Sequence, residues 1–320
     1  MSAESDSADK TSRMLSVVAG AYNEEENIEE FLSRVRAALG QIPEFSYEII
    51  IIDNASTDGT LAKLRRECEK DARLKVIVNA RNFGHIRSPY HAFLQTSGDA
   101  VIYLASDLQD PPEMIPQLVA AWKKGAKAVV AIKDSSDEGG AFFFLRKMYY
   151  RLVEKLADVR TFQNFTGFGF YDRQIVEYCR HLNDPYPYFR GIIAEMGLPV
   201  QELHYHQPAR KRGITKNNFY TLYDMAMLGI TKHSKIPLRL ATMSGFLMSV
   251  LSLLVGFTYL IYKLLFWQQF PAGTAPLVIG LFFFASVQLF FIGILGEYIG
   301  SIHTQVHKRP LVVEKERLNF

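Results

Sequence analysis

Short apolar runs alternate with amphipathic segments along the first 135 residues of the chain. Five mostly apolar runs without polar alternation cover residues 15–21, 47–52, 74–78, 100–104 and 128–132. Between them apolar residues recur every three or four positions, which predicts helices; the clearest set is Ile28, Phe31, Leu32, Val35 and Leu39. Strand–helix alternation of this kind is typical of a parallel sheet covered on both faces. We therefore predict an α/β fold with a doubly wound, mostly parallel sheet.

The pattern is less regular between residues 139 and 216. Residues 139–159 predict a loop followed by an aromatic-rich helix, and residues 161–173 are rich in glycine and aromatic side chains. The remaining expected elements are helices at 174–180 and 191–197, a strand at 199–205 and a basic, glycine-containing loop at 208–216.

Two long apolar stretches dominate the C-terminal third. Leu240–Phe266 holds a single charge, Lys263, and Pro276–Gly296 holds none. Each stretch reaches the about 20 residues that cross a bilayer, so we predict a transmembrane hairpin. An amphipathic helix at 218–236 is expected to lie on the membrane surface before it. A buried apolar hairpin in a soluble protein is the alternative.

Cations flank this hairpin on its outer ends, at Arg239 before the first stretch and at Lys308 and Arg309 after the second. By the positive-inside rule, both termini of this two-span membrane protein are expected in the cytoplasm. The predicted parts are a disordered tail at 1–13, a cytoplasmic domain at 14–217, the juxtamembrane helix at 218–236, the hairpin at 237–300 and a cytoplasmic tail at 301–320.

Composition excludes several classes of protein. A net charge of +3, from 36 basic and 33 acidic residues, is too small to indicate a nucleic-acid partner. Cys68 and Cys179 form no paired motif, which fits a reducing compartment and argues against a disulfide framework or a zinc site. The polar N-terminus predicts no signal peptide. The absence of glycine-rich phosphate-binding motifs disfavours dinucleotide dehydrogenases and P-loop NTPases.

Acidic and amide side chains follow three of the predicted strands, at Glu24, Asp53 and the segment from Asp107 to Gln109. The carboxyl ends of parallel strands share one edge of a sheet, where ligands bind. These residues therefore predict a ligand site rich in oxygen donors. Asp53 as a helix N-cap and Asp107 as a turn residue before Pro111 are the alternatives.

Four segments resemble the family-2 glycosyltransferases of GT-A fold, and in particular the branch that uses polyprenyl phosphates. These are Ala21–Glu24, Asp53–Thr60, Arg81–His85 and Asp107–Pro112. The Leu295–Gly300 segment and the Arg210–Lys216 loop are also similar to that branch, and the resemblance extends from about Leu15 to Pro310. It implies an enzyme of the bacterial inner membrane. The enzyme would move a sugar from a nucleotide diphosphate sugar to a polyprenyl phosphate, with inversion, at the cytoplasmic face.

The resemblance assigns roles to individual residues. Ala21, Tyr22, Glu24 and Asp53 would hold the base and ribose. Asp107 and Gln109 would hold Mg²⁺ or Mn²⁺, which prefer such hard oxygen ligands. The cations assigned to the phosphates are Lys133 near the donor diphosphate, and Arg210, Lys216 and Arg190 at the donor diphosphate or the lipid phosphate. An ordinary solvated or membrane-surface basic loop is the alternative for Arg210 and Lys216.

The carboxylate of Asp53 can accept hydrogen bonds from uracil and from guanine, so it does not choose the donor, although we favour UDP over GDP. The sugar, the lipid and the oligomeric state are not determined by the sequence. Similar proteins form homo-oligomers, and the aromatic segment 142–150 is a candidate contact.

Two positions depart from the family pattern. Ala105 replaces the first acid of the metal motif, and Asn164 stands where relatives carry an Asp proposed as a base. Asp110 is expected to cap or brace the turn. A lipid phosphate is largely anionic near neutral pH, with a second pKa of about 6, so it needs no base. The alternatives are a transferase with another acceptor and a catalytically impaired membrane scaffold.

Overall fold

The structure is a computed structural model that describes residues 13–134, 162, 164–208, 227–228, 231, 236–266 and 274–320. The chain divides into two compact units. The first contains the sheet, its helices and the C-terminal residues 308–320, and the second contains the two longest helices.

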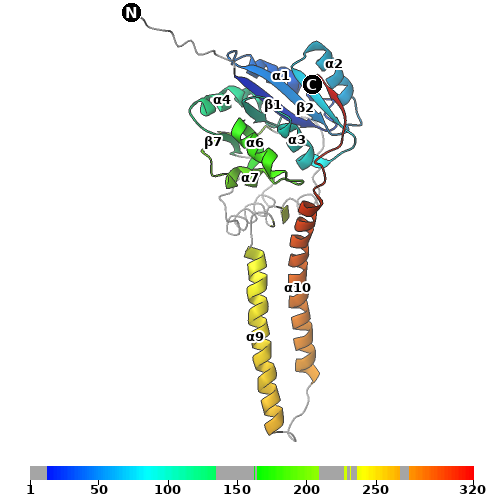
Figure 1. Ribbon diagram of the computed structural model, residues 1–320, viewed down its shortest axis with the longest axis vertical. Coiled ribbons are helices and arrows are strands. Elements are labelled where there is room, and N and C mark those ends of the chain that lie inside the picture. Colours follow the sequence, from blue (N-terminus) through cyan, green and yellow to red (C-terminus); the bar gives the residue numbers. More distant parts are fainter. Residues whose placement is uncertain are drawn as a thin grey trace, which may run out of the picture. The chain divides into compact units, whose positions relative to one another are not determined.

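An eight-stranded sheet forms the centre of the first unit (Figure 1), with strand order β7-β5-β6-β4-β1-β2-β3-β8. The strands are β1 (Met14–Ala21), β2 (Ser46–Asp53), β3 (Leu74–Asn79), β4 (Ala100–Tyr103), β5 (Ala128–Lys133), β6 (Phe165–Asp172), β7 (Val200–Tyr205) and β8 (Glu314–Leu318). The central strands β4, β1, β2 and β3 are parallel, as are β5 and β7. The predicted, mostly parallel sheet is thus confirmed, with antiparallel pairings made by β6 and β8.

Helices cover both faces of this sheet. Their bounds are α1 (Ile28–Leu39), α2 (Thr60–Lys70), α3 (Gly84–Leu94), α4 (Ile115–Lys123), α6 (Arg173–Leu182) and α7 (Phe189–Glu195), with a short 3₁₀ turn, η1 (Pro112–Met114). Apolar side chains of α1, α2 and α4 pack in one core layer with Val17 and Ile51. Those of α3, α6 and α7 pack in the other with Val18 and Ile50. Because neighbouring residues of one strand enter opposite layers, the strands are apolar throughout.

Two strands were not expected from the sequence. β6 contains Gly167 and Gly169, and at Gly169 an added Cβ would collide with the carbonyl oxygen of Val129. Only glycine permits that approach of β5, although glycine is otherwise depleted in strands. β8 lies within the predicted C-terminal tail and pairs antiparallel with β3.

The second unit contains α9 (Ile236–Leu265) and α10 (Thr274–His307), which lie side by side (Figure 1). Both are long and apolar enough to cross a membrane, with candidate spans at Ile236–Thr258 and Phe283–His307. Large apolar side chains stand exposed along them, including Phe246, Leu247 and Phe290. Such exposure is unfavourable in water, so it supports the predicted hairpin.

The tail at 1–12, the helix at 139–159 and most of the helix at 218–236 lie outside the described residues.

Candidate active site

Asp53 ends β2 opposite Ala21, the last residue of β1. Its side chain is fully buried, and its Oδ2 accepts a hydrogen bond from the backbone N–H of Ser56 at 3.1 Å. Its Oδ1 is buried without a hydrogen-bond donor among the described residues. Burial raises the pKa of this carboxyl, and hydrogen bonds from Ser56 oppose the shift. Asp53 is not a helix N-cap, because α2 begins at Thr60, and its Oδ1 is a buried acceptor without a donor among the described residues.

The segment after β1 is fixed against the segment after β2. Asn23 lies in the left-handed region at φ 55°, and its Oδ1 accepts a hydrogen bond from the N–H of Thr57 at 2.8 Å. The N–H of Glu24 donates to Oγ1 of Thr60 at 2.9 Å, and Oε2 of Glu24 accepts from Nδ2 of Asn27. Ala21, Glu24 and Asp53 are therefore brought to one edge of the sheet, and Tyr22 lies between the first two.

The loop after β4 is attached to the same edge. Oγ of Ser106 donates to the carbonyl oxygen of Gly20 at 2.8 Å, which places the loop at the end of β1. Oδ1 of Asp107 accepts from the N–H of Gln109 at 3.1 Å, across a turn in which Leu108 has φ 64°. Asp107 and Gln109 thus share one tight turn next to the end of β1.

Asp110 braces this loop from within the protein. Its Oδ2 accepts from the N–H of Ala105 at 3.0 Å, and its Oδ1 accepts from the hydroxyl of Tyr205 at 2.9 Å. Burial is the main reason that the pKa of Asp110 rises to about 6; the charge of Asp107 raises it further, while Lys133 lowers it. Lys133, at the end of β5, and Asp107 therefore both lie close enough to Asp110 for their charges to act on it.

The oxygen donors at this edge only partly suit a divalent cation. No group of three or more His, Cys, Asp or Glu side chains placed to hold a metal occurs in the described part of the chain. Asp110 is engaged by Ala105 and Tyr205, which leaves Asp107 and Gln109 as donors. One carboxylate and one amide fit a hard cation only when phosphate or water oxygens complete its shell.

Arg190 lies on α7. Its positive charge adds to burial in lowering the pKa of His85. Arg190 is thus near the start of α3. Arg210 and Lys216 lie outside the described residues, so their predicted roles stay predictions.

Three asparagines beside Asp53 were not singled out from the sequence. Nδ2 of Asn54 donates to Oδ1 of Asn82 at 2.9 Å, and Nδ2 of Asn79 donates to Oδ1 of Asn54 at 3.0 Å. The N–H of Phe83 also donates to Oδ1 of Asn54. This network holds residues 82–84 against the end of β2. Asparagine at successive strand ends was the available signal, because its amide readily bonds turn backbone.

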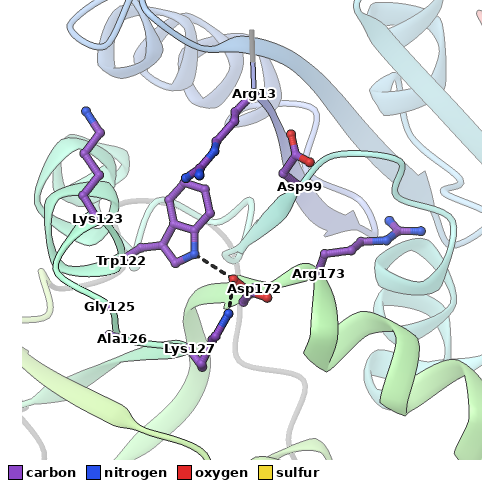
Figure 2. A pocket seen from close by; sticks show the side chains of 9 residues that line it. All are labelled: Arg13, Asp99, Trp122, Lys123, Gly125, Ala126, Lys127, Asp172 and Arg173. Carbon is purple, nitrogen blue, oxygen red and sulfur yellow. Dashed lines mark hydrogen bonds and ion pairs between the residues drawn. The ribbon is translucent and has the colours of Figure 1, made fainter. Parts of the chain in front are cut away.

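A cavity of about 470 Å³ lies at the opposite, amino-terminal edge of the parallel strands (Figure 2). Arg13, Asp99, Trp122 and Lys127 are among its lining residues. Both Nε1 of Trp122 and Nζ of Lys127 donate to Asp172, at 2.9 and 3.2 Å, as Figure 2 shows. The polar groups of this cavity are largely satisfied within the protein, in contrast to Asp53.

Residues 16–192 match the family described as Glycosyl transferase family 2. The chain belongs to glycosyl transferase family 2. A second match, to the GtrB C-terminal hairpin, covers residues 236–302 and therefore α9 and most of α10.

Relatives of this family 2 protein match it over nearly its whole length. It is 32% identical over 301 residues to an uncharacterized glycosyltransferase, YkcC, of Bacillus subtilis, covering 93% of this chain and 92% of the relative. It is also 32% identical over 303 residues to a prophage-derived bactoprenol glucosyl transferase of Shigella flexneri, covering 94% and 97%. Among solved structures, glucosyl-3-phosphoglycerate synthase of Mycobacterium tuberculosis is similar, with 20% identity, a TM-score of 0.47 and coverage of 69% and 79%. By its family, this chain is a glycosyltransferase.

Proposed function

We propose that this glycosyltransferase moves a sugar from a nucleotide diphosphate sugar, with UDP favoured over GDP, to a polyprenyl phosphate such as undecaprenyl or dolichyl phosphate. The reaction takes place at the cytoplasmic face of the bacterial inner membrane and inverts the anomeric carbon. The relative from Shigella flexneri, named as a bactoprenol glucosyl transferase, supports this choice of acceptor.

The pairing of β8 with β3 is the observation that carries the proposal. The chain leaves the sheet, passes through α9 and α10, and returns to the same sheet. If both helices cross the bilayer, the number of crossings is even, and the site stays on one side of the membrane. A transferase domain tied to a membrane hairpin at both ends is suited to an acceptor that itself resides in the membrane.

On the donor side, Oδ1 of Asp53 accepts an N–H of the base, and Tyr22 and Glu24 border the base and ribose. Buried acceptors without a donor are rare in folded proteins, because each costs about 1–3 kcal/mol. A base that supplies the missing N–H removes that cost. Asp53 therefore contributes binding energy that an exposed carboxylate would not.

At the diphosphate, Asp107 and Gln109 would hold Mg²⁺ or Mn²⁺. The bound cation would neutralise the charge that develops on the leaving diphosphate. Lys133 adds positive charge to the same place, and Arg210, Lys216 and Arg190 are assigned to the donor diphosphate or the acceptor phosphate.

The chemistry requires one displacement. A phosphate oxygen of the acceptor forms a bond to the anomeric carbon, and the bond from that carbon to the nucleotide diphosphate breaks with its electron pair. The acceptor phosphate is already anionic, so no proton has to be removed and Asn164 need not act as a base. The protein contributes position and charge stabilisation.

Transfer with the purified full-length protein tests the proposal. The protein is incubated in detergent with radiolabelled UDP- or GDP-sugars, Mg²⁺ or Mn²⁺, and undecaprenyl or dolichyl phosphate. A glycolipid is expected, with the opposite anomeric configuration to the donor by NMR. The absence of glycolipid with every pair, from a protein that still binds UDP, would instead favour another acceptor. The absence of both activities would favour the impaired scaffold.

A further inference from the structure

Two arginines flank one aromatic ring at the start of α3. The guanidinium carbon of Arg81 lies 4.1 Å from the ring centroid of Phe83, and that of Arg87 lies 5.5 Å from the same centroid. Arg81 is exposed and Arg87 is half-buried. The ring thus gathers two positive charges into a small area.

The C-terminal segment brings a third arginine to this area. Nη2 of Arg87 donates to the carbonyl oxygen of Pro310 at 2.6 Å, next to the exposed Arg309. Arg309 follows His307, the last residue of α10, by two positions. Its Cα therefore lies within about 8 Å of the end of a candidate membrane span. We call Arg81, Arg87 and Arg309 the arginine cluster.

The positive charge of the arginine cluster is not neutralised within the described part of the chain. None of the three has a carboxylate within ion-pair distance there, whereas Arg65 and Arg317 pair with Glu316 and Glu314. The first turn of α3 also carries no acidic residue, although the positive end of a helix dipole favours one.

The other two charges of the arginine cluster act on Arg87. Burial, followed by the charges of Arg81 and Arg309, lowers the pKa of its guanidinium. Its Nε is buried and has no hydrogen-bond acceptor in the described structure. An anion at this position would relieve the repulsion between the three charges.

We propose that the arginine cluster binds the phosphate of an anionic membrane phospholipid. Guanidinium groups match phosphate oxygens in geometry, and their charge is weakly hydrated. The closeness of Arg309 to the end of α10 favours a lipid headgroup over a soluble anion, because juxtamembrane cations lie at headgroup level. This inference rests on the membrane placement of the proposed function, but it needs neither the donor nor the reaction.

Native mass spectrometry of the full-length protein tests the site. Phosphatidylglycerol is titrated into protein purified in a neutral detergent, with phosphatidylcholine as the neutral lipid. Arg87→Gln/Arg309→Gln is compared with Arg66→Gln/Lys124→Gln, which removes two exposed cations elsewhere on the sheet domain. We expect the Kd for phosphatidylglycerol to rise at least about tenfold in the first variant and to stay unchanged in the second.

The single variant Arg309→Gln is not expected to disturb folding, because Arg309 makes no hydrogen bond or ion pair within the described structure. Weaker phosphatidylglycerol binding by this variant, which we also expect, would therefore report on the site itself. Equal phosphatidylglycerol affinity in all variants would overturn the proposal. Displacement of the lipid by millimolar inorganic phosphate would assign the site to a soluble anion. Displacement by equimolar undecaprenyl phosphate would assign it to the acceptor. The lipid titration contains no nucleotide sugar, so its result does not depend on whether the protein transfers a sugar.

Discussion

The hydroxyl of Tyr205, at the end of β7, donates a hydrogen bond to Oδ1 of Asp110 at 2.9 Å. This bond connects the edge strand β7 with the loop that carries Asp107 and Gln109. The other oxygen of Asp110 accepts from the N–H of Ala105, so one buried carboxylate fixes the loop from two sides. The conformation of the loop that carries Asp107 and Gln109 therefore depends on the buried carboxylate of Asp110.

Asp110 should make the stability of the protein depend on pH in an unusual direction. Burial raises its pKa in the folded protein from 3.8 to about 6, so the fold binds this proton more tightly than the unfolded chain does. Ionised Asp110 therefore costs stability above pH 6, and the cost disappears as the pH falls towards 4. Between pH 7 and pH 5 the gain is about 1 kcal/mol. The melting temperature of wild type relative to Asp110→Asn should rise over this interval.

Tyr205→Phe provides the matched test, because it removes the hydrogen bond that stabilises ionised Asp110 and leaves the ring in place. The pKa of Asp110 should rise further, and the pH-dependent gain should begin at higher pH than in wild type. A difference between wild type and Asp110→Asn that stays constant from pH 7 to pH 5 would contradict the assignment.

Asp53→Asn should weaken donor binding more than it affects folding. The substitution places an NH₂ or a single carbonyl oxygen where two carboxylate oxygens stood, so Ser56 and the base compete for one acceptor. We expect the Kd for UDP to rise roughly tenfold to a hundredfold, measured by calorimetry. Asp99→Asn is the control, because Asp99 also accepts one backbone N–H, from Met14, but lies before β4 at the opposite edge. Equal effects of the two substitutions would remove Asp53 from the donor site.

The parallel core of the sheet could be predicted because burial on both faces makes its strands continuously apolar. β6 could not, since its glycines weaken the strand pattern and are required by the approach of β5. β8 has the sequence Glu-Lys-Glu-Arg-Leu, and such charge is how edge strands avoid pairing with other chains. Its partner, β3, is more than 200 residues away in sequence, and no local pattern reports that pairing.

The candidate site could be predicted where a side chain acts from the end of its own strand, as Asp53 does. Asn23 acts between two strand ends and not at a helix start: α1 begins at Ile28, and Oδ1 of Asn23 accepts a hydrogen bond from the N–H of Thr57. The network of Asn54, Asn79 and Asn82 joins two strand ends; the asparagines themselves are a sequence signal, but which of them bond one another follows only from the register between β2 and β3.

Glu48→Gln should destabilise the protein without changing donor binding. Glu48 is buried in β2, far from the site, and accepts hydrogen bonds from Lys75 at 2.7 Å, Ser16 at 2.6 Å and Ser97 at 2.8 Å. Burial alone would raise its pKa, but these bonds together lower it. Losing the charge leaves Lys75 without its partner and costs about 2–3 kcal/mol. The melting temperature in detergent should fall by several degrees, while the Kd for UDP stays within twofold; a large change in Kd would contradict a purely structural role.

Asn319→Ala should destabilise the attachment of β8 to the rest of the sheet. Nδ2 of Asn319 donates to the carbonyl oxygens of Cys68 and Leu74, each at 2.9 Å, so one amide fastens the end of β8 to α2 and β3. Its loss should cost about 1 kcal/mol locally and speed amide hydrogen exchange in β8 several-fold. Lys315→Ala is the control, because Lys315 is exposed on the same strand. Equal exchange in the two variants would mean that backbone pairing with β3 alone holds β8. Faster exchange in Asn319→Ala, with α1 unaffected, would mean that the C-terminal strand opens as a unit of its own.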